Sequence, residues 1–248
     1  MKTLIVSTRQ PGDDARLTTA LGCPAAEVVN PGLWRIVGET PPAGGQGLMP
    51  RPGDWWIIPS RHAVPYIAAL PVALRRKVRA ICLGHGTERQ LQAAGVGTIR
   101  LPAAGHDSEA LLAMAEMQQV AGRTITLLTA PGGRDLIPST LRQRGAEVRI
   151  LYVYRREPSA PDPAVLARIA GHQGGFVTLA TSAGGLKALL DTLPPRVWQH
   201  LLTQPVIVIS KRLAASAAEL GFTRIVSSPD PGTESLATCC RTLLSQYK

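Results

Sequence analysis

Aromatic residues are scarce in this chain and make up 4 % of its 248 residues. Proteins that bind nucleic acid by base stacking present several aromatic side chains on one surface, so we expect no nucleic-acid partner. Only five histidines are present, and they show no metal-ligand spacing, so no metal site is expected. No apolar stretch approaches the length of a membrane span, which argues against a membrane partner.

Cysteines are also few, and the four that occur are Cys23, Cys82, Cys239 and Cys240. They form neither a CxxC motif nor a zinc-ligand pattern, and the adjacent pair fits a helical packing pattern. A chain without a disulfide framework suits a reducing compartment. The first apolar run stops at Val6, too short for a signal peptide. We therefore expect a cytoplasmic protein.

Acidic residues are outnumbered, with 17 of them against 27 lysines and arginines, a formal net charge of +10. This excess suits an anionic partner, such as nucleic acid, an acidic membrane surface, or a carboxylate or phosphate ligand. The basic residues are scattered, and the densest cluster is Arg75–Lys77 with Arg79. We favour a small anionic ligand, and the alternative is a solvated basic surface.

The chain contains an internal repeat of about half its length. The matching segments and residues are 3–8 with 124–129, 57–60 with 179–182, Gly84 with Ser210, Gly95 with Gly221, and Ile99 with Ile225. A large unit that occurs only twice is not a solenoid. It predicts two similar domains, and a cleft between paired domains is a favoured ligand site.

Short apolar runs alternate with helical patterns, which predicts βα units around a mainly parallel sheet. The expected strands are 4–8, 55–59, 79–84, 98–101, 124–129, 147–155, 176–181, 206–210 and 224–227. Helical patterns include 136–145 and 214–220. The predicted fold class is α/β, with two similar open parallel-sheet domains in a bilobed, internally duplicated chain.

Two segments rich in Pro or Gly interrupt this pattern, at 41–53 and 157–163. They bracket residues 54–156, which we predict to be one domain. Residues 1–40 and 158–248 would then form the other, so each repeat gives its first strand and helix to the opposite domain. Two chain crossings make a double hinge that would let a cleft open and close.

Small hydroxyl-bearing or glycine residues follow most of the expected strands. They are Thr8, Ser60, Gly84 with Thr87, Thr129, Ser182 and Ser210. The carboxyl ends of parallel strands line the ligand crevice of open α/β sheets, and the helix N-termini there suit carboxylates. The alternative at each position is an ordinary helix N-cap.

Two catalytic templates fit poorly. The segment 180–184 is similar to a nucleophile elbow, but the later His200 and the intervening Asp191 lie in one helical stretch with it. The segment 84–89 lacks the third glycine of a dinucleotide fingerprint. Neither a hydrolase triad nor a dinucleotide site is expected.

The segment 122–156 resembles the most recognisable stretch of the uroporphyrinogen-III synthase family, G-x-x-x-L-x-x-x-x-G-x-R-[DE]-x-L-x-x-x-L-x-x-x-G-x-x-V-x-x-x-x-x-Y. The resemblance covers the chain end to end. Thr8-Arg9 is similar to the end of the family's opening strand, 58–60 and 180–182 to its two strand-end serines, and 84–87 to its G-x-x-T turn.

The resemblance implies a bilobed lyase with two α/β domains joined by a two-stranded linker. Such enzymes of haem and sirohaem biosynthesis cyclise hydroxymethylbilane, a linear tetrapyrrole with eight carboxylates, to uroporphyrinogen III with loss of water and inversion of ring D. The resemblance implies no metal or organic cofactor and a cytoplasmic monomer. A transient contact with the preceding pathway enzyme is also among the expected partners.

On this resemblance, hydroxide leaves the terminal carbon to give an azafulvene, and attack at ring D gives a spiro intermediate. The bilane closes unaided to the type I isomer, so the enzyme's main task is to hold it in the productive geometry. Tyr154 matches the family's tyrosine placed as a general acid, and the alternative is a packed interlobe tyrosine. The implied substrate-binding residues are Arg9, Ser60, His62, Thr87, Arg134, Ser182, Lys211 and Arg212.

Two positions depart from the family pattern. His62 stands where many relatives carry arginine, which puts direct carboxylate pairing there in question. Ser210-Lys211-Arg212 replaces G-P-[ST]-T, so the two cations are carboxylate contacts, which we favour, or a solvated helix start. The alternative to the enzyme is a diverged, non-catalytic homologue that binds a tetrapyrrole or another polyanionic ligand. A nucleic-acid binder is less favoured, because no helix-turn-helix is visible.

Overall fold

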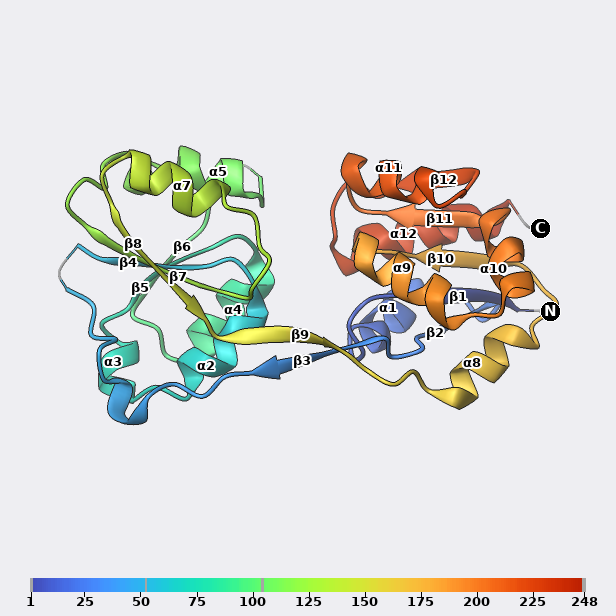
Figure 1. Ribbon diagram of the computed structural model, residues 1–248, viewed down its shortest axis with the longest axis horizontal. Coiled ribbons are helices and arrows are strands. Elements are labelled where there is room, and N and C mark those ends of the chain that lie inside the picture. The colour runs from blue at the N-terminus through green and yellow to red at the C-terminus, as the bar shows by residue number, and fades with distance from the viewer. Residues whose placement is uncertain (1, 52, 104, 247–248) are drawn as a thin grey trace. The chain divides into compact units, whose positions relative to one another are not determined.

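The structure, a computed structural model, describes residues 2–51, 53–103 and 105–246 (Figure 1). The chain forms two compact units. The end unit contains residues 1–35 and 157–248, and the middle unit contains residues 36–156. Residues 36–53, which the sequence analysis divided between the first domain and a linker, lie in the middle unit.

The middle unit contains a five-stranded parallel sheet in the order β6-β5-β4-β7-β8. Its strands are β4 (Trp55–Ile58), β5 (Arg79–Cys82), β6 (Thr98–Arg100), β7 (Thr124–Thr129) and β8 (Glu147–Tyr152). Successive side chains of a strand point to opposite faces, so Trp55 and Trp56 of β4 enter different core clusters. A continuous apolar run buried on both faces is typical of parallel sheets.

Helices cover both faces of this sheet (Figure 1). One face packs against α2 (Val64–Ala68), α3 (Val72–Arg75) and α4 (His85–Ala93), and the opposite face packs against α5 (Ser108–Ala113), α6 (Ala115–Gln118) and α7 (Leu136–Gln143). Two short 3-10 turns, η1 (Ala43–Gly45) and η2 (Arg61–Ala63), lie in its loops. The middle unit therefore has the layers expected of an open α/β domain.

The end unit repeats this architecture with strand order β12-β11-β10-β1-β2. Its strands are β1 (Thr3–Ser7), β2 (Ala26–Val29), β10 (Phe176–Leu179), β11 (Pro205–Val208) and β12 (Arg224–Ser227), and all neighbours are parallel. One face packs against α8 (Pro163–Ala170), α9 (Ala183–Thr192), α10 (Pro195–Leu202) and α11 (Lys211–Glu219), and the other against α1 (Asp14–Leu21) and α12 (Thr233–Ser245).

The two sheets have the same strand order when β7 is matched with β1 and β4 with β10. The duplicated fold predicted from the sequence is therefore confirmed, with the first strand of each repeat in the opposite sheet. Gly95 and Gly221, which the repeat pairs, both follow a helix and have φ values of +76° and +97°. This left-handed conformation favours glycine, which explains why both repeats carry it there.

The chain passes between the units at β3 (Trp34–Gly38) and β9 (Tyr154–Pro158), which form a two-stranded sheet. The single strand expected over 147–155 is wrong in one respect, because β8 ends at Tyr152 and β9 starts at Tyr154. The second predicted linker also ends in a helix, since Pro163 is the first residue of α8. Among the described residues, no helix has the length and apolar character needed to cross a membrane.

Candidate functional site

Ser60 lies just beyond the carboxyl end of β4 in the middle unit. Its Oγ accepts a hydrogen bond from the backbone N–H of His62, at 3.3 Å, and so caps η2. Ser60 is therefore a helix N-cap, the alternative to a ligand role that the sequence analysis left open. Because the oxygen acts as acceptor in the cap, the hydroxyl hydrogen is left to donate to a ligand.

Tyr154 is the first residue of β9 and is 6 % exposed, packed in the core beneath α2 and α4. Its ring lies edge-on to the ring of His62, with centroids 5.6 Å apart and an interplanar angle of 61°. The structure thus brings Tyr154 to Ser60 and His62, which lie more than 90 residues earlier in the sequence. The imidazole of His62 therefore packs against the ring of the candidate acid.

Thr87 lies in the first turn of α4 and is 7 % exposed. Its backbone N–H donates to the carbonyl of Gly84 at 3.0 Å. Helix α4 packs against η2, so the element that carries Thr87 lies beside the one that carries His62. Arg134 precedes α7, is well exposed, and forms an ion pair with Glu109 of α5 at 3.4 Å.

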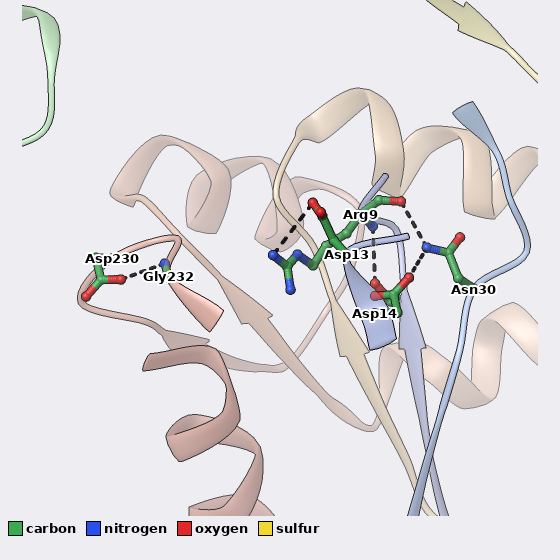
Figure 2. Close-up of polar contacts among 7 residues, drawn as sticks. Arg9, Asp13, Asp14, Asn30, Asp230 and Gly232 are labelled. Carbon is green, nitrogen blue, oxygen red and sulfur yellow. Dashed lines mark hydrogen bonds and ion pairs between the residues drawn. The ribbon is translucent and has the colours of Figure 1, made fainter. Parts of the chain in front are cut away.

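Arg9 follows β1 in the end unit and is 8 % exposed. Its Nη2 lies 3.8 Å from the Asp13 carboxylate, whereas its Nη1 is buried with no hydrogen-bond partner (Figure 2). Leaving a buried donor unsatisfied is costly, more so when it carries charge. A bound anion would satisfy this nitrogen, so the burial of Arg9 supports a ligand-binding role.

Asn30 fixes the backbone at Arg9 and was missed by the sequence analysis. Its Nδ2 donates to the Arg9 carbonyl at 3.0 Å and to the carboxylate of Asp14 (Figure 2). Asn30 directly follows β2, a strand that the sequence analysis also missed. An amide side chain at a strand end was the only sequence signal available for it.

Ser182 follows β10 and caps α9, where its Oγ accepts from the backbone N–H of Gly185 at 3.1 Å. Gly185 lies against Thr8, which is 3 % exposed and donates its hydroxyl to the carbonyl of Leu179. A Cβ atom at Gly185 would lie 2.9 Å from Thr8 Oγ1 and 3.1 Å from Ser182 Oγ. The glycine therefore lets the first turn of α9 approach the residue that follows β1.

Gly185→Ala is expected to destabilise the protein, although alanine is normally the better helix residue. Overpacking against buried Thr8 should cost about 1–3 kcal/mol, more than the helix-propensity gain of roughly 0.5–1 kcal/mol. The matched control is Gly86→Ala in α4, where an added Cβ meets nothing within 4 Å and should stabilise slightly. Urea unfolding of both variants measures the difference, and equal stabilisation would contradict the close approach.

Ser210 caps α11 through a bond from the Leu213 backbone N–H at 3.2 Å. Lys211 and Arg212 occupy the first turn of this helix and are exposed. Cations in the first turn are opposed by the helix dipole, so helix stability does not account for them. An anionic ligand at this strand end would account for both.

The two buried thiols, Cys82 and Cys240, make poor nucleophiles. Burial raises the pKa of Cys82 to about 12, with a smaller contribution from the negative charge of Glu88. Burial also raises the pKa of Cys240 to about 12. Within the described ranges, no three His, Cys, Asp or Glu side chains group into a metal-binding cluster.

Comparisons with known proteins agree with this architecture. The profile of the family described as "Uroporphyrinogen-III synthase HemD" matches residues 20–238. A protein named uroporphyrinogen-III synthase from Salmonella typhimurium is 33 % identical over 187 residues, covering 71 % of this chain and 74 % of the relative. The Escherichia coli protein of the same name is 32 % identical over 155 residues, covering 62 % of this chain and 63 % of the relative.

Two solved structures share the fold. The uroporphyrinogen-III synthetase from Helicobacter pylori superimposes with a TM-score of 0.66 at 15 % identity, covering 99 % of this chain and all of that one. A mutant uroporphyrinogen III synthase from Thermus thermophilus gives a TM-score of 0.56 at 17 % identity, with coverage of 98 % and 99 %. At these identities the likeness concerns the fold alone.

Proposed function

The chain belongs to the uroporphyrinogen-III synthase family, and we propose that it cyclises hydroxymethylbilane to uroporphyrinogen III with loss of water. The observation that carries this proposal is the family match across residues 20–238, supported by 33 % identity to the Salmonella typhimurium enzyme. The reaction is an elimination followed by ring closure, with no net change in oxidation state. Acid catalysis and control of conformation are sufficient for it.

We assign the acid role to Tyr154. Departure of hydroxide from the terminal carbon is assisted by a proton donor, and positioned proton transfer accelerates such steps by about 10²–10⁴-fold. The ring of Tyr154 is held by the core and by the edge of His62, so its hydroxyl has a defined position. Ser60 and Thr87, from neighbouring elements, supply hydroxyl donors for the bound substrate.

We assign the binding of the substrate carboxylates to cationic residues and helix-capping residues near the strand ends. Arg9 offers a buried, unsatisfied guanidinium nitrogen, and Lys211 and Arg212 offer exposed cations at a helix N-terminus. Ser182 and the free amides of helix starts add neutral donors. Arg134 is assigned to carboxylate binding as well, with Glu109 exchanged for a substrate carboxylate when the ligand is bound.

The product isomer tests this function. The chain is incubated with freshly prepared hydroxymethylbilane, the products are oxidised, and the type I and type III porphyrins are separated. We expect type III to dominate, whereas a sample without protein gives type I. A type III fraction equal to that of the protein-free sample would leave only the non-catalytic binding alternative.

We further propose that the enzyme acts in the cytoplasm as a monomer and needs no cofactor. The four cysteines are free thiols, which suits a reducing compartment. The substrate cyclises unaided, so rapid passage from the preceding pathway enzyme would favour the type III product. A transient contact with that enzyme is therefore part of the proposal.

A further inference from the structure

Two histidines outside the assigned site lie close together in the middle unit. His85 is the first residue of α4, and His106 lies in the loop between β6 and α5. Their ring centroids are 5.8 Å apart, with an interplanar angle of 74°. This pair was not predictable from sequence spacing, because the loop after β6 brings His106 back to the end of β5.

Each ring is held at its Nδ1 atom by an acceptor. His85 Nδ1 lies 3.0 Å from Oε2 of Glu88, and His106 Nδ1 lies 2.8 Å from the backbone carbonyl oxygen of Leu83. An ionised carboxylate and a carbonyl oxygen accept but do not donate, so both Nδ1 atoms carry the hydrogen. In the neutral rings, the Nε2 atom of each histidine therefore has its lone pair available.

Metal-ligating histidines share this kind of support at the nitrogen that does not bind the metal. Such histidines almost always donate the hydrogen of the other ring nitrogen to a carboxylate or a backbone carbonyl, which fixes the tautomer and the ring orientation. Here both kinds of partner are present, the carboxylate of Glu88 for His85 and the carbonyl of Leu83 for His106. Glu88 belongs to α4, whereas Leu83 follows β5, so each ring is oriented by a different element.

The ring separation also suits one shared ion. A metal bound at about 2.0–2.1 Å by Nε2 lies roughly 3 Å from the centre of each ring, so two ligating rings have centroids no more than about 6 Å apart. The observed 5.8 Å falls within this limit. The side chain of His85 is 74 % exposed, which leaves room for water in the remaining coordination positions.

We propose that His85 and His106 form a surface site for a divalent transition metal, bound through the two Nε2 atoms. Glu88 and the Leu83 carbonyl orient the rings, and the negative charge of Glu88 also favours a cation nearby. Imidazole ligands suit Zn²⁺, Ni²⁺ and Cu²⁺, whereas Mg²⁺ and Ca²⁺ prefer oxygen. The site is therefore selective for Zn²⁺, Ni²⁺ and Cu²⁺ over Mg²⁺ and Ca²⁺. The thiol of Cys82 is fully buried and takes no part.

Titration of the full chain with ZnCl₂, followed by calorimetry, tests the site. His85→Gln and His106→Gln are each expected to weaken Zn²⁺ binding at least 10-fold, since either change leaves one imidazole. Glu88→Ala should weaken it about 10- to 100-fold through loss of the support for His85. Titration with Mg²⁺ should give no heat of binding. The electron paramagnetic resonance spectrum of bound Cu²⁺ should show coupling to two ring nitrogens.

The matched controls are His172→Gln and His200→Gln in the end unit. Both histidines pack edge-on against Phe176, with centroids 4.9 and 5.5 Å from it, and Nε2 of His172 lies 3.2 Å from the carbonyl oxygen of Gly175. Each control should bind Zn²⁺ with unchanged affinity. Equal Kd values for the wild type and both variants of the proposed pair would overturn the site. Circular dichroism verifies that every variant is folded, including those at the half-buried Glu88 and His172.

Discussion

Tyr154→Phe is expected to lower kcat about 100-fold or more while leaving the protein folded. The substitution keeps the buried ring and its contact with His62 and removes only the hydroxyl. A proton donor that acts in the transition state contributes about 10²–10⁴-fold to the rate, and its loss should appear in kcat more than in KM. Steady-state kinetics with hydroxymethylbilane, read as formation of the type III isomer, measures the effect.

The matched control for this variant is Tyr66→Phe. Tyr66 is 7 % exposed and belongs to the same core cluster as Tyr154, but it lies within α2. Burial raises the pKa of Tyr66, so this phenol is a weak proton donor. Removing the Tyr66 hydroxyl should leave kcat unchanged. If both variants retained wild-type turnover, Tyr154 would be a packing residue and the acid would have to be sought elsewhere.

Arg9→Met is expected to reduce kcat/KM roughly 10- to 100-fold with only a small change in stability. A hydrogen bond to a charged group contributes about 1.5–3 kcal/mol, which corresponds to this loss of affinity. The same substitution removes a buried nitrogen that has no partner, which favours stability, but it also takes the ion-pair partner at 3.8 Å from the Asp13 carboxylate, which opposes it. Kinetics and urea unfolding on one preparation measure both quantities.

The control is Arg16→Met on the neighbouring helix α1, where the side chain is exposed. It makes the same change of charge without touching the end of β1, so kcat/KM should stay close to the wild-type value. A purely structural role for Arg9 predicts a different result, namely a clear loss of stability with normal kinetics. An equal fall in kcat/KM for both variants would indicate that only the overall positive charge matters.

Much of the fold was predictable because the buried strands are strongly apolar. β4 and β10 are buried along their whole length, and the repeat matched their ends to each other as equivalent segments. The missed strands are of another kind. β3 alternates between half-buried and exposed residues, and β2 is a four-residue edge strand with only one fully buried residue. Such segments owe their conformation to their neighbours, and their own sequence carries little signal.

The start of α8 was missed because the segment before it is rich in proline. The Pro-rich segment before α8 was interpreted as a linker, yet Asp162 accepts a bond from the Ala164 backbone N–H at 2.8 Å and Pro163 occupies the first turn. An acidic N-cap followed by proline is a helix-start signal. The last two residues of the predicted linker, Asp162 and Pro163, were therefore misassigned because only the proline content was considered.

The candidate site was predictable residue by residue but not in its contacts. Strand-end serines were expected either to cap helices or to bind a ligand, and the structure shows the caps at Ser60, Ser182 and Ser210. The packing of His62 on Tyr154 and the support of Arg9 by Asn30 depend on segments distant in sequence. Spacing along one chain carries no information about such contacts.

The exchange of first strands between the repeats has a consequence for biosynthesis. On the ribosome, β1, α1 and β2 emerge first, yet Leu4 of β1 pairs with Phe176 of β10, which is translated much later. The middle unit, residues 36–156, is complete before β10 leaves the exit tunnel and can fold as a domain. The opening segment must wait, with the β10 side of its apolar strand uncovered, until β10 has been made. Premature termination between residues 156 and 176 therefore yields one folded half and a β1 without its β10 partner, a product suited to capture by chaperones.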